Sequence, residues 1–335
     1  MFHKALWIRS YKQTKIVIWL LWVVSLLTLP IPYLYQTTTM ASRIGHSSDY
    51  WYFFSYHTSL LPLSALVILM GCLLIGLERT NQEMDFMFAL PFRRRDLFIV
   101  KWLLGAVNIV SITLVNLMLM FLIHQGTIFS STPSFSPFLT FFGLMVIALL
   151  SVYSLTLFIG SFTGGIIMQA LLTIAFCFLP WLLSATIFLP FDYLPEWHDI
   201  FRHISPFFII EHDFLFEQRG QIVHLSSNHP TFATFLSLSC YFIISLPLGM
   251  LLYEQTPGEK NGKIILYKSL EPIFIFIVMA IGGLFGGLIS ANILSSLGIS
   301  ELMRYYFGFI LTAITIYFLL VKLMKKPLKY KRLST

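Results

Sequence analysis

Side chains that could bind a metal or transfer protons gather in one stretch of the chain, residues 190–231. Five of the nine histidines fall there, together with several aspartates and glutamates. Zinc sites and metalloproteases use regular ligand spacings such as His-Glu-x-x-His. No such spacing occurs in this sequence, and neither Gly-x-Ser-x-Gly nor Ser-x-x-Lys is present. We therefore expect solvated loop histidines and no bound metal, with a membrane-embedded enzyme kept as an alternative.

One stretch superficially resembles a phosphate-binding loop, from Gly258 to Ile264. Three residues separate its two glycines where four are required, and Ile264 stands where a Ser or Thr would hold magnesium. No strand-like segment precedes it. We expect no nucleotide site, no catalytic residue and no cofactor bound by this chain.

Residues 78–101 combine three kinds of side chain that suit contact with another protein. An acidic, helix-competent piece is broken near Pro91, and a basic cluster then runs into the next apolar segment. The apolar residues from Met84 to Leu90 must bury against lipid or a partner protein. The alternative is an interfacial loop whose arginines only set topology. The candidate residues are Glu78, Glu83, Phe86, Phe88, Pro91, Arg93, Arg94, Arg95 and Lys101.

The elements that must position these residues are membrane helices. Of the 335 residues, 57% are apolar and 11% charged, with a mean hydropathy of +0.80, whereas soluble domains carry about 25% charged residues. A span needs about 20 apolar residues, so we expect one all-α domain, 1–335, folded as a polytopic bundle of eight spans. The expected spans are 16–35, 58–77, 102–124, 138–160, 166–189, 232–253, 272–292 and 305–321.

Positive charge divides unevenly between the segments that join these spans. One alternating set holds 18 of the 22 Lys and Arg residues, and the other set holds four. Cytoplasmic segments are enriched in Lys and Arg, so we expect both termini in the cytoplasm. The net charge of +7 then faces anionic lipid, and no nucleic-acid partner is expected.

The same reasoning assigns the remaining segments. Residues 78–101 form a cytoplasmic loop, 190–231 an extracytoplasmic loop and 322–335 a basic cytoplasmic tail. Residues 1–15 form either an interfacial helix, with Phe2, Leu6 and Trp7 toward lipid, or an ordinary charged flank.

The expected spans contain few polar residues and no ionisable residue in their interiors. Ionisable side chains in a bilayer mark proton and ion pathways, so an ion-coupled carrier is disfavoured. Asn116 and Gln169 are expected to hydrogen-bond between helices. Small residues four apart allow helices to approach closely, and the pairs Gly282/Gly286 and Gly283/Gly287 therefore predict a packing face.

The 78–101 segment resembles the cytoplasmic loop of ABC-2 type transporter permeases. The matching positions are Glu78, Glu83, Leu90-Pro91, Arg93, Arg94, Arg95 and Lys101. A second cytoplasmic loop resembles the same family through Tyr253, Glu259, Gly262 and Leu266, although Gln255 stands where a basic residue is common. The opening residues 1–7 and the eight-span layout look most like the Ytr-type permeases of Gram-positive bacteria.

The resemblance implies a permease subunit of an ABC transporter. It further implies a separate cytosolic ABC ATPase that uses ATP and docks on 78–101, a second permease copy or related subunit, and surrounding membrane lipid. Export or envelope-related transport is also implied, with a link either to the response to cell-envelope antibiotics or to acetoin use. A membrane scaffold or envelope-stress sensor without transport remains an alternative.

The charge distribution makes a topology prediction. Single cysteines outside should react with an impermeant reagent in intact cells, and those inside only after permeabilisation. Labelling of position 260 from outside would contradict the predicted orientation. The outside positions are Gly45, Ser130, Leu215 and Gly298, and the inside positions are Gln82, Lys260 and Tyr330.

Overall fold

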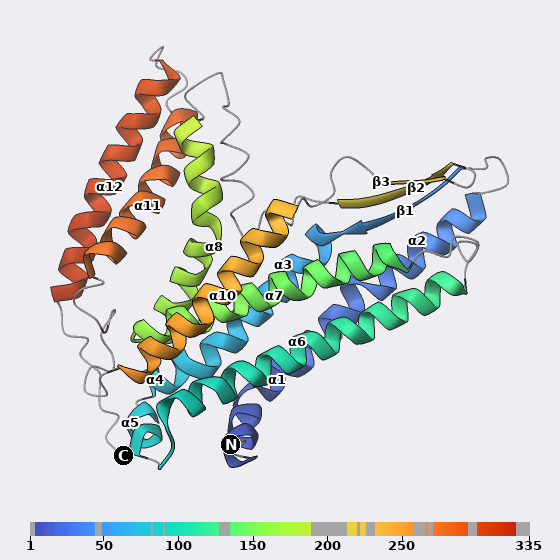
Figure 1. The fold of residues 1–335 in the computed structure, drawn as a ribbon. Coiled ribbons are helices and arrows are strands. Elements are labelled where there is room, and N and C mark those ends of the chain that lie inside the picture. The colour runs from blue at the N-terminus through green and yellow to red at the C-terminus, as the bar shows by residue number, and fades with distance from the viewer. Residues whose placement is uncertain are drawn as a thin grey trace.

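The computed structural model gives the arrangement of the predicted helices (Figure 1). It describes residues 4–43, 49–81, 83–89, 91–126, 135–188, 213–219, 222–225, 232–256, 266, 271–293 and 300–325. Every structural statement below concerns these residues.

The predicted helical membrane bundle is confirmed. Seven helical stretches of the described chain are long and apolar enough to cross a membrane. The remaining predicted span, 166–189, corresponds to α8, Ile166–Phe188, and its stretch Ile166–Phe178 is shorter than a full span. The other helices are α1 Lys4–Thr28, α2 Pro30–Arg43, α3 Tyr56–Gly71, α4 Glu78–Thr80, α5 Glu83–Ala89, α6 Arg94–Gln125, α7 Ser136–Phe162, α10 Phe232–Glu254, α11 Glu271–Ile293 and α12 Glu301–Lys325.

Helix α7 lies in the middle of the bundle and packs against α3, α6, α8 and α10 (Figure 1). Its buried side chains include Phe138, Phe141, Met145 and Tyr153. The start of α1, helices α4 and α5, and the end of α10 lie at one end of the bundle, which we call the α5 end. By the charge distribution this is the predicted cytoplasmic end.

A small antiparallel sheet lies at the opposite end and was not predicted. Strand β1, Asp49–Ser55, pairs with β2, Asp213–Arg219, and β2 pairs with β3, Ile222–Leu225. In this register Tyr52 lies opposite Phe216. The sheet joins the segment after the first span to the 190–231 segment. Its aromatic strand β1 suits pleated structure, but the partner strand lies more than 150 residues away.

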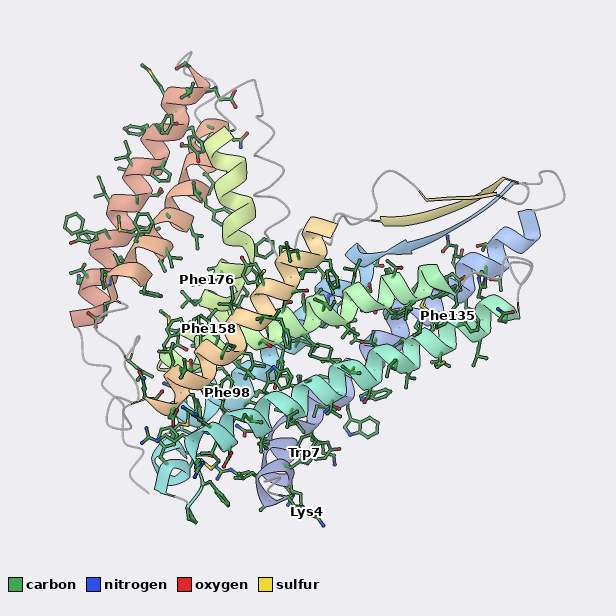
Figure 2. All side chains as sticks on the ribbon, viewed as in Figure 1. Lys4, Trp7, Phe98, Phe135, Phe158 and Phe176 are labelled. Carbon is green, nitrogen blue, oxygen red and sulfur yellow. The ribbon has the colours of Figure 1, made fainter. Side chains whose placement is uncertain are left out.

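Residues 4–15 form the first turns of α1 and are continuous with the first span. Leu6 is buried in the bundle while Lys4 is exposed, and Figure 2 labels Lys4 and Trp7 on these turns. The stretch is therefore not a helix separate from α1. Whether its outer face lies in the lipid headgroups stays a prediction.

Helices α11 and α12 form a hairpin that contacts the remaining bundle through α8 (Figure 1). The glycines of the predicted packing face, Gly282, Gly283, Gly286 and Gly287, all face α12. A Cβ atom on Gly286 would lie 2.1 Å from Thr312 Oγ1, and one on Gly283 would lie 2.9 Å from the Phe309 ring. The small residues thus let the two helices approach within one subunit.

Gly105 in α6 is another point of close approach. A Cβ atom there would lie 2.2 Å from Cζ of Tyr153, whose hydroxyl donates to the Lys101 carbonyl at 2.6 Å. Gly105→Ala should therefore cost about 1–3 kcal/mol through overpacking, seen as a lower thermal midpoint in detergent. Gly143→Ala is the matched control, since no atom lies within 4 Å of its added Cβ. Equal midpoints for the two variants would show that α6 and α7 are not packed as described.

Candidate functional site: buried charges at the α5 end

The 78–101 segment is largely helical. Helix α4 continues the second span, α5 is a separate short helix, and α6 begins at Arg94 with Arg93 in an extended conformation before it. The chain turns between α5 and α6 around exposed Pro91, where the sequence predicted a break. The segment therefore folds as a helical connection rather than an open loop.

Glu78 and Lys101 form a buried ion pair where α4 meets α6. Each residue is only 1% exposed. Lys101 Nζ donates to Glu78 Oε2 and also to the Leu74 carbonyl at 2.6 Å. Removing one partner of such a pair leaves an uncompensated buried charge. The pair therefore holds α4 and α6 together, and neither charge is available to a docking protein.

Arg79 is buried beside this pair and extends the contact to two further helices. Its Nη2 donates to the Ser161 carbonyl at 2.8 Å, near the end of α7. The same nitrogen lies 3.5 Å from Thr256 Oγ1, just after α10. Thr256 Oγ1 itself donates to the Ser161 carbonyl at 3.2 Å. One arginine thus ties α4 to the ends of both α7 and α10.

Tyr253 of α10 covers the pair from the side of α5. Lys101 Nζ lies 5.7 Å from its ring centroid, within the range of a cation–π interaction. The Phe98 and Phe88 rings pack against it at centroid distances of 5.6 and 5.8 Å. Figure 2 shows Phe98 near the point where α6 and α10 approach. The tyrosine thereby connects the membrane helices to α5.

Two apolar side chains of α5 are covered within the chain. Met84 and Met87 are buried, and the Tyr253 hydroxyl lies 3.6 Å from Met84 Sδ. Phe88 is half-buried beneath the Arg94 guanidinium, whose Cζ lies 4.2 Å from the ring centroid. The expectation that this run needs lipid or a partner is therefore wrong for Met84 and Met87. The Phe86 and Leu90 side chains lie outside those described.

Charged residues around α5 make contacts at the surface. Arg9 of α1 pairs with Glu83 at 2.8 Å, and Arg95 pairs with Glu254 at 2.5 Å. These pairs are well exposed, so each adds little to stability. Arg94 Nη1 donates to the Glu254 and Thr256 carbonyls at 3.0 and 2.7 Å, and so it satisfies carbonyls at the C-terminal end of α10.

The second predicted loop is only partly placed. Glu259 and Gly262 lie outside the described residues, so their assignment stays a prediction. Leu266 is buried, and its backbone N–H donates to the Phe162 carbonyl at 3.1 Å. The chain after α10 therefore returns to the end of α7, beside Arg79.

Two predictions about polar residues in spans have different outcomes. Asn116 donates to Ser25 Oγ, and Gln169 donates to the carbonyls of Gly71 and Thr156, as expected for interhelical bonds. The spans as drawn hold no ionisable residue in their interiors, but the helices extend past the predicted ends, and Glu78, Arg79 and Lys101 are buried in these extensions. His124 is also buried, bonded to the Tyr33 hydroxyl at 2.8 Å.

Sequence reasoning missed Arg79 and Thr256. Arg79 follows Glu78 at the end of an apolar run, where a basic residue usually marks a boundary. Its position on the helix, one residue after Glu78, did not indicate that α7 and α10 would cover it. Nothing in the sequence distinguishes Thr256, two residues after the end of α10, from an ordinary loop threonine.

Comparison with known proteins decides the family. Residues 10–256 match the ABC-2 family of transporter proteins. The chain belongs to the ABC-2 transporter family. The permease is also 24% identical over 312 residues to the probable ABC transporter permease YtrC of Bacillus subtilis strain 168. The aligned region covers 85% of this chain and 89% of that relative. No solved structure matches the chain significantly.

Family membership makes this chain a transport subunit rather than an enzyme, and a multi-pass protein of the plasma membrane. ABC-2 permeases generally work with a cytosolic ATPase. The matched range ends at Thr256, the residue that Arg79 approaches, so the α11–α12 hairpin lies beyond it.

The buried pair gives a double-mutant prediction. Lys101→Met alone should cost about 3–5 kcal/mol, because Glu78 is left buried and unpaired. Adding Glu78→Gln removes that charge and should restore most of the thermal midpoint measured in detergent. Arg95→Met breaks an exposed pair and should change stability by no more than about 1 kcal/mol. A double variant no more stable than Lys101→Met would show that the charges do not pair.

Proposed function

We propose that this permease is driven by a separate cytosolic ABC ATPase that docks on α5 and the turn before α6. The observation that supports this is that α5 and the turn before α6 have an exposed outer surface, while the inner side of α5 is packed against the bundle. Glu83, Pro91, Arg93 and Arg95 are exposed, while Met84 and Met87 are packed beneath them. A force applied to this short helix would reach the bundle through Tyr253 and the buried charges.

The ATPase would use the ATP, and this chain would bind no nucleotide or other cofactor. Exposed arginines offer planar, bidentate donors for carboxylates on such a partner. A second copy of the permease or a related subunit would complete the pathway, since two ATPases close on each other around bound nucleotide. The two permeases together would exchange between two conformational states. A ligand can shift that equilibrium only by the difference between its affinities for the two states.

Export or envelope-related transport is the direction we propose, by similarity to the Ytr-type permeases. The chain offers no buried charge relay across the middle of its described helices for ion coupling, since its buried Glu78, Arg79 and Lys101 cluster at one end. A link to antibiotic response rests on that similarity alone and stays a prediction.

Charge reversal at the exposed turn tests docking. Arg93→Glu should lower recovery of the ATPase with affinity-tagged permease by about tenfold or more, because like charges at an interface cost several kcal/mol. Arg93 is exposed, so the permease itself should remain folded. Phe88 is less suitable for this test, because it packs against Tyr253 within the chain.

The matched control is Lys322→Glu, which removes an exposed and predicted cytoplasmic charge from α12 instead. Its ATPase recovery should equal that of the wild type. Equal recovery for Arg93→Glu and wild type would contradict docking at this turn. A wild-type permease that recovers no ABC ATPase would favour the scaffold or sensor alternative.

A further inference from the structure

The helix that connects the membrane to the proposed docking element contains a π-helical segment. Residues Cys72–Leu77 form η2, between α3 and α4. The flanking residues Gly71 and Glu78 both have right-handed helical conformations, so the backbone runs through without a break. π-Helical turns are rare, hold one more residue than an α-turn, and are frequent at functional sites.

Two backbone carbonyls of this segment and that of Gly71, just before it, receive hydrogen bonds from three other helices. Gln13 Nε2 of α1 donates to the Leu73 carbonyl at 2.7 Å. Lys101 Nζ of α6 donates to the Leu74 carbonyl at 2.6 Å. Gln169 Nε2 of α8 donates to the Gly71 carbonyl at 3.2 Å. Each of these bonds ties the backbone in or just before the π-helical turn to another helix, and so favours the arrangement seen here.

Glycines mark this segment and give its backbone freedom. Gly71 immediately precedes it and packs on α7, where an added Cβ atom would lie 2.7 Å from Thr156 Cγ2. Gly76, within it, packs on α8, where an added Cβ atom would lie 2.7 Å from Ile166 Cα. Glycine makes a change of backbone conformation easier than any other residue does. The close contacts also mean that any such change is felt by α7 and α8.

The polar contacts of the segment are incomplete in this state. Gln169 is fully buried, and its Nε2 donates to the carbonyls of Gly71 and Thr156. Its Oε1 has no hydrogen-bond partner among the described residues. A buried acceptor without a partner is uncommon. The present arrangement therefore leaves room for a second one in which this amide is better satisfied.

We propose that Cys72–Leu77 is a two-state register switch between π-helix and α-helix. Conversion to α-helix would change the phase of α3 relative to α4 and α5 by about one residue, or about 100°, while the buried contacts of Glu78 and Arg79 keep α4 in place. Gln13, Lys101 and Gln169 act as positioning residues that hold the π-helical state. The inference rests on the proposed function, because the docked ATPase would be what biases the two states.

Deleting Leu73 tests the switch directly. Removing one residue from a π-turn yields an uninterrupted α-helix while the flanking helices keep their faces. The deletion variant should still recover the ATPase, because the exposed surface of α5 is unchanged. It should lose permease-stimulated ATP hydrolysis by about tenfold or more, in the range of typical allosteric couplings. Wild-type hydrolysis by the deletion variant would overturn the inference.

Spin labels at Leu61 and Asn81 report the change itself. Both residues are exposed and lie on opposite sides of the segment. Cys72 and Cys177 are buried, so only exposed Cys240 needs replacement by serine before labelling. In the wild-type complex a non-hydrolysable ATP analogue should shift the distance between the labels. In the deletion variant the distance should be the same with and without the analogue.

A second variant applies if the deletion impairs folding. Gln13→Met with Gln169→Met removes two donors at similar volume and should move the resting distance toward the nucleotide-bound value. Asn116→Leu is the matched control, because Asn116 is as buried as Gln169 but bonds to Ser25, away from the segment. An unchanged distance in the double variant would overturn the switch.

The outcomes separate the two proposals. If the wild type recovers an ATPase but nucleotide leaves the label distance unchanged, the switch is wrong and the proposed docking stands. If the wild type recovers no ATPase, the proposed function is wrong and the switch falls with it.

Discussion

Burial of two cations and one carboxylate at the α5 end is the constraint on which the rest of the structure depends. Removing a charge from water is tolerated only if it is paired and hydrogen-bonded. Glu78 meets this requirement through Lys101, and the Arg79 guanidinium donates a hydrogen bond to the Ser161 carbonyl. Each partner belongs to a different helix. The ends of α4, α6, α7 and α10 therefore cannot separate without exposing or orphaning a charge.

This cluster explains how a short surface helix can be mechanically connected to a membrane bundle. The exposed pairs Arg9–Glu83 and Arg95–Glu254 orient α5 and the start of α6 but contribute little stability. The stronger attachment runs beneath them, through Met84, Tyr253 and Lys101. A partner seated on α5 would thus act on helices rather than on a loose loop.

The lipid-facing α11–α12 hairpin is held together by different interactions. Helices α11 and α12 expose large apolar side chains along most of their length, which lipid can cover at no cost. Because lipid gives no hydrophobic drive for helices to associate, close approach must come from small residues. Gly282, Gly283, Gly286 and Gly287 supply it. Helices α11 and α12 consequently pack against each other more extensively than against the rest of the bundle.

The sequence alone determined the features that depend on local composition. Apolar length located the membrane helices, Pro91 marked the break between α5 and α6, and the glycine spacing in 282–287 located a packing face. Asn116 and Gln169 were identified as interhelical hydrogen-bonding residues, because an amide within an apolar span must find a partner inside the bundle.

Only the tertiary structure decided which partners those local features meet. It buried Glu78, Arg79 and Lys101, which their position at the span ends had suggested were at the surface. It also brought β1 beside β2 across the chain, and it supplied Gln13, Lys101 and Gln169 to carbonyls in or just before η2. Hydropathy and helical phase are properties of neighbouring residues. Charge pairing, strand pairing and the choice of a π-turn instead depend on groups that are distant in sequence and meet only when the helices pack.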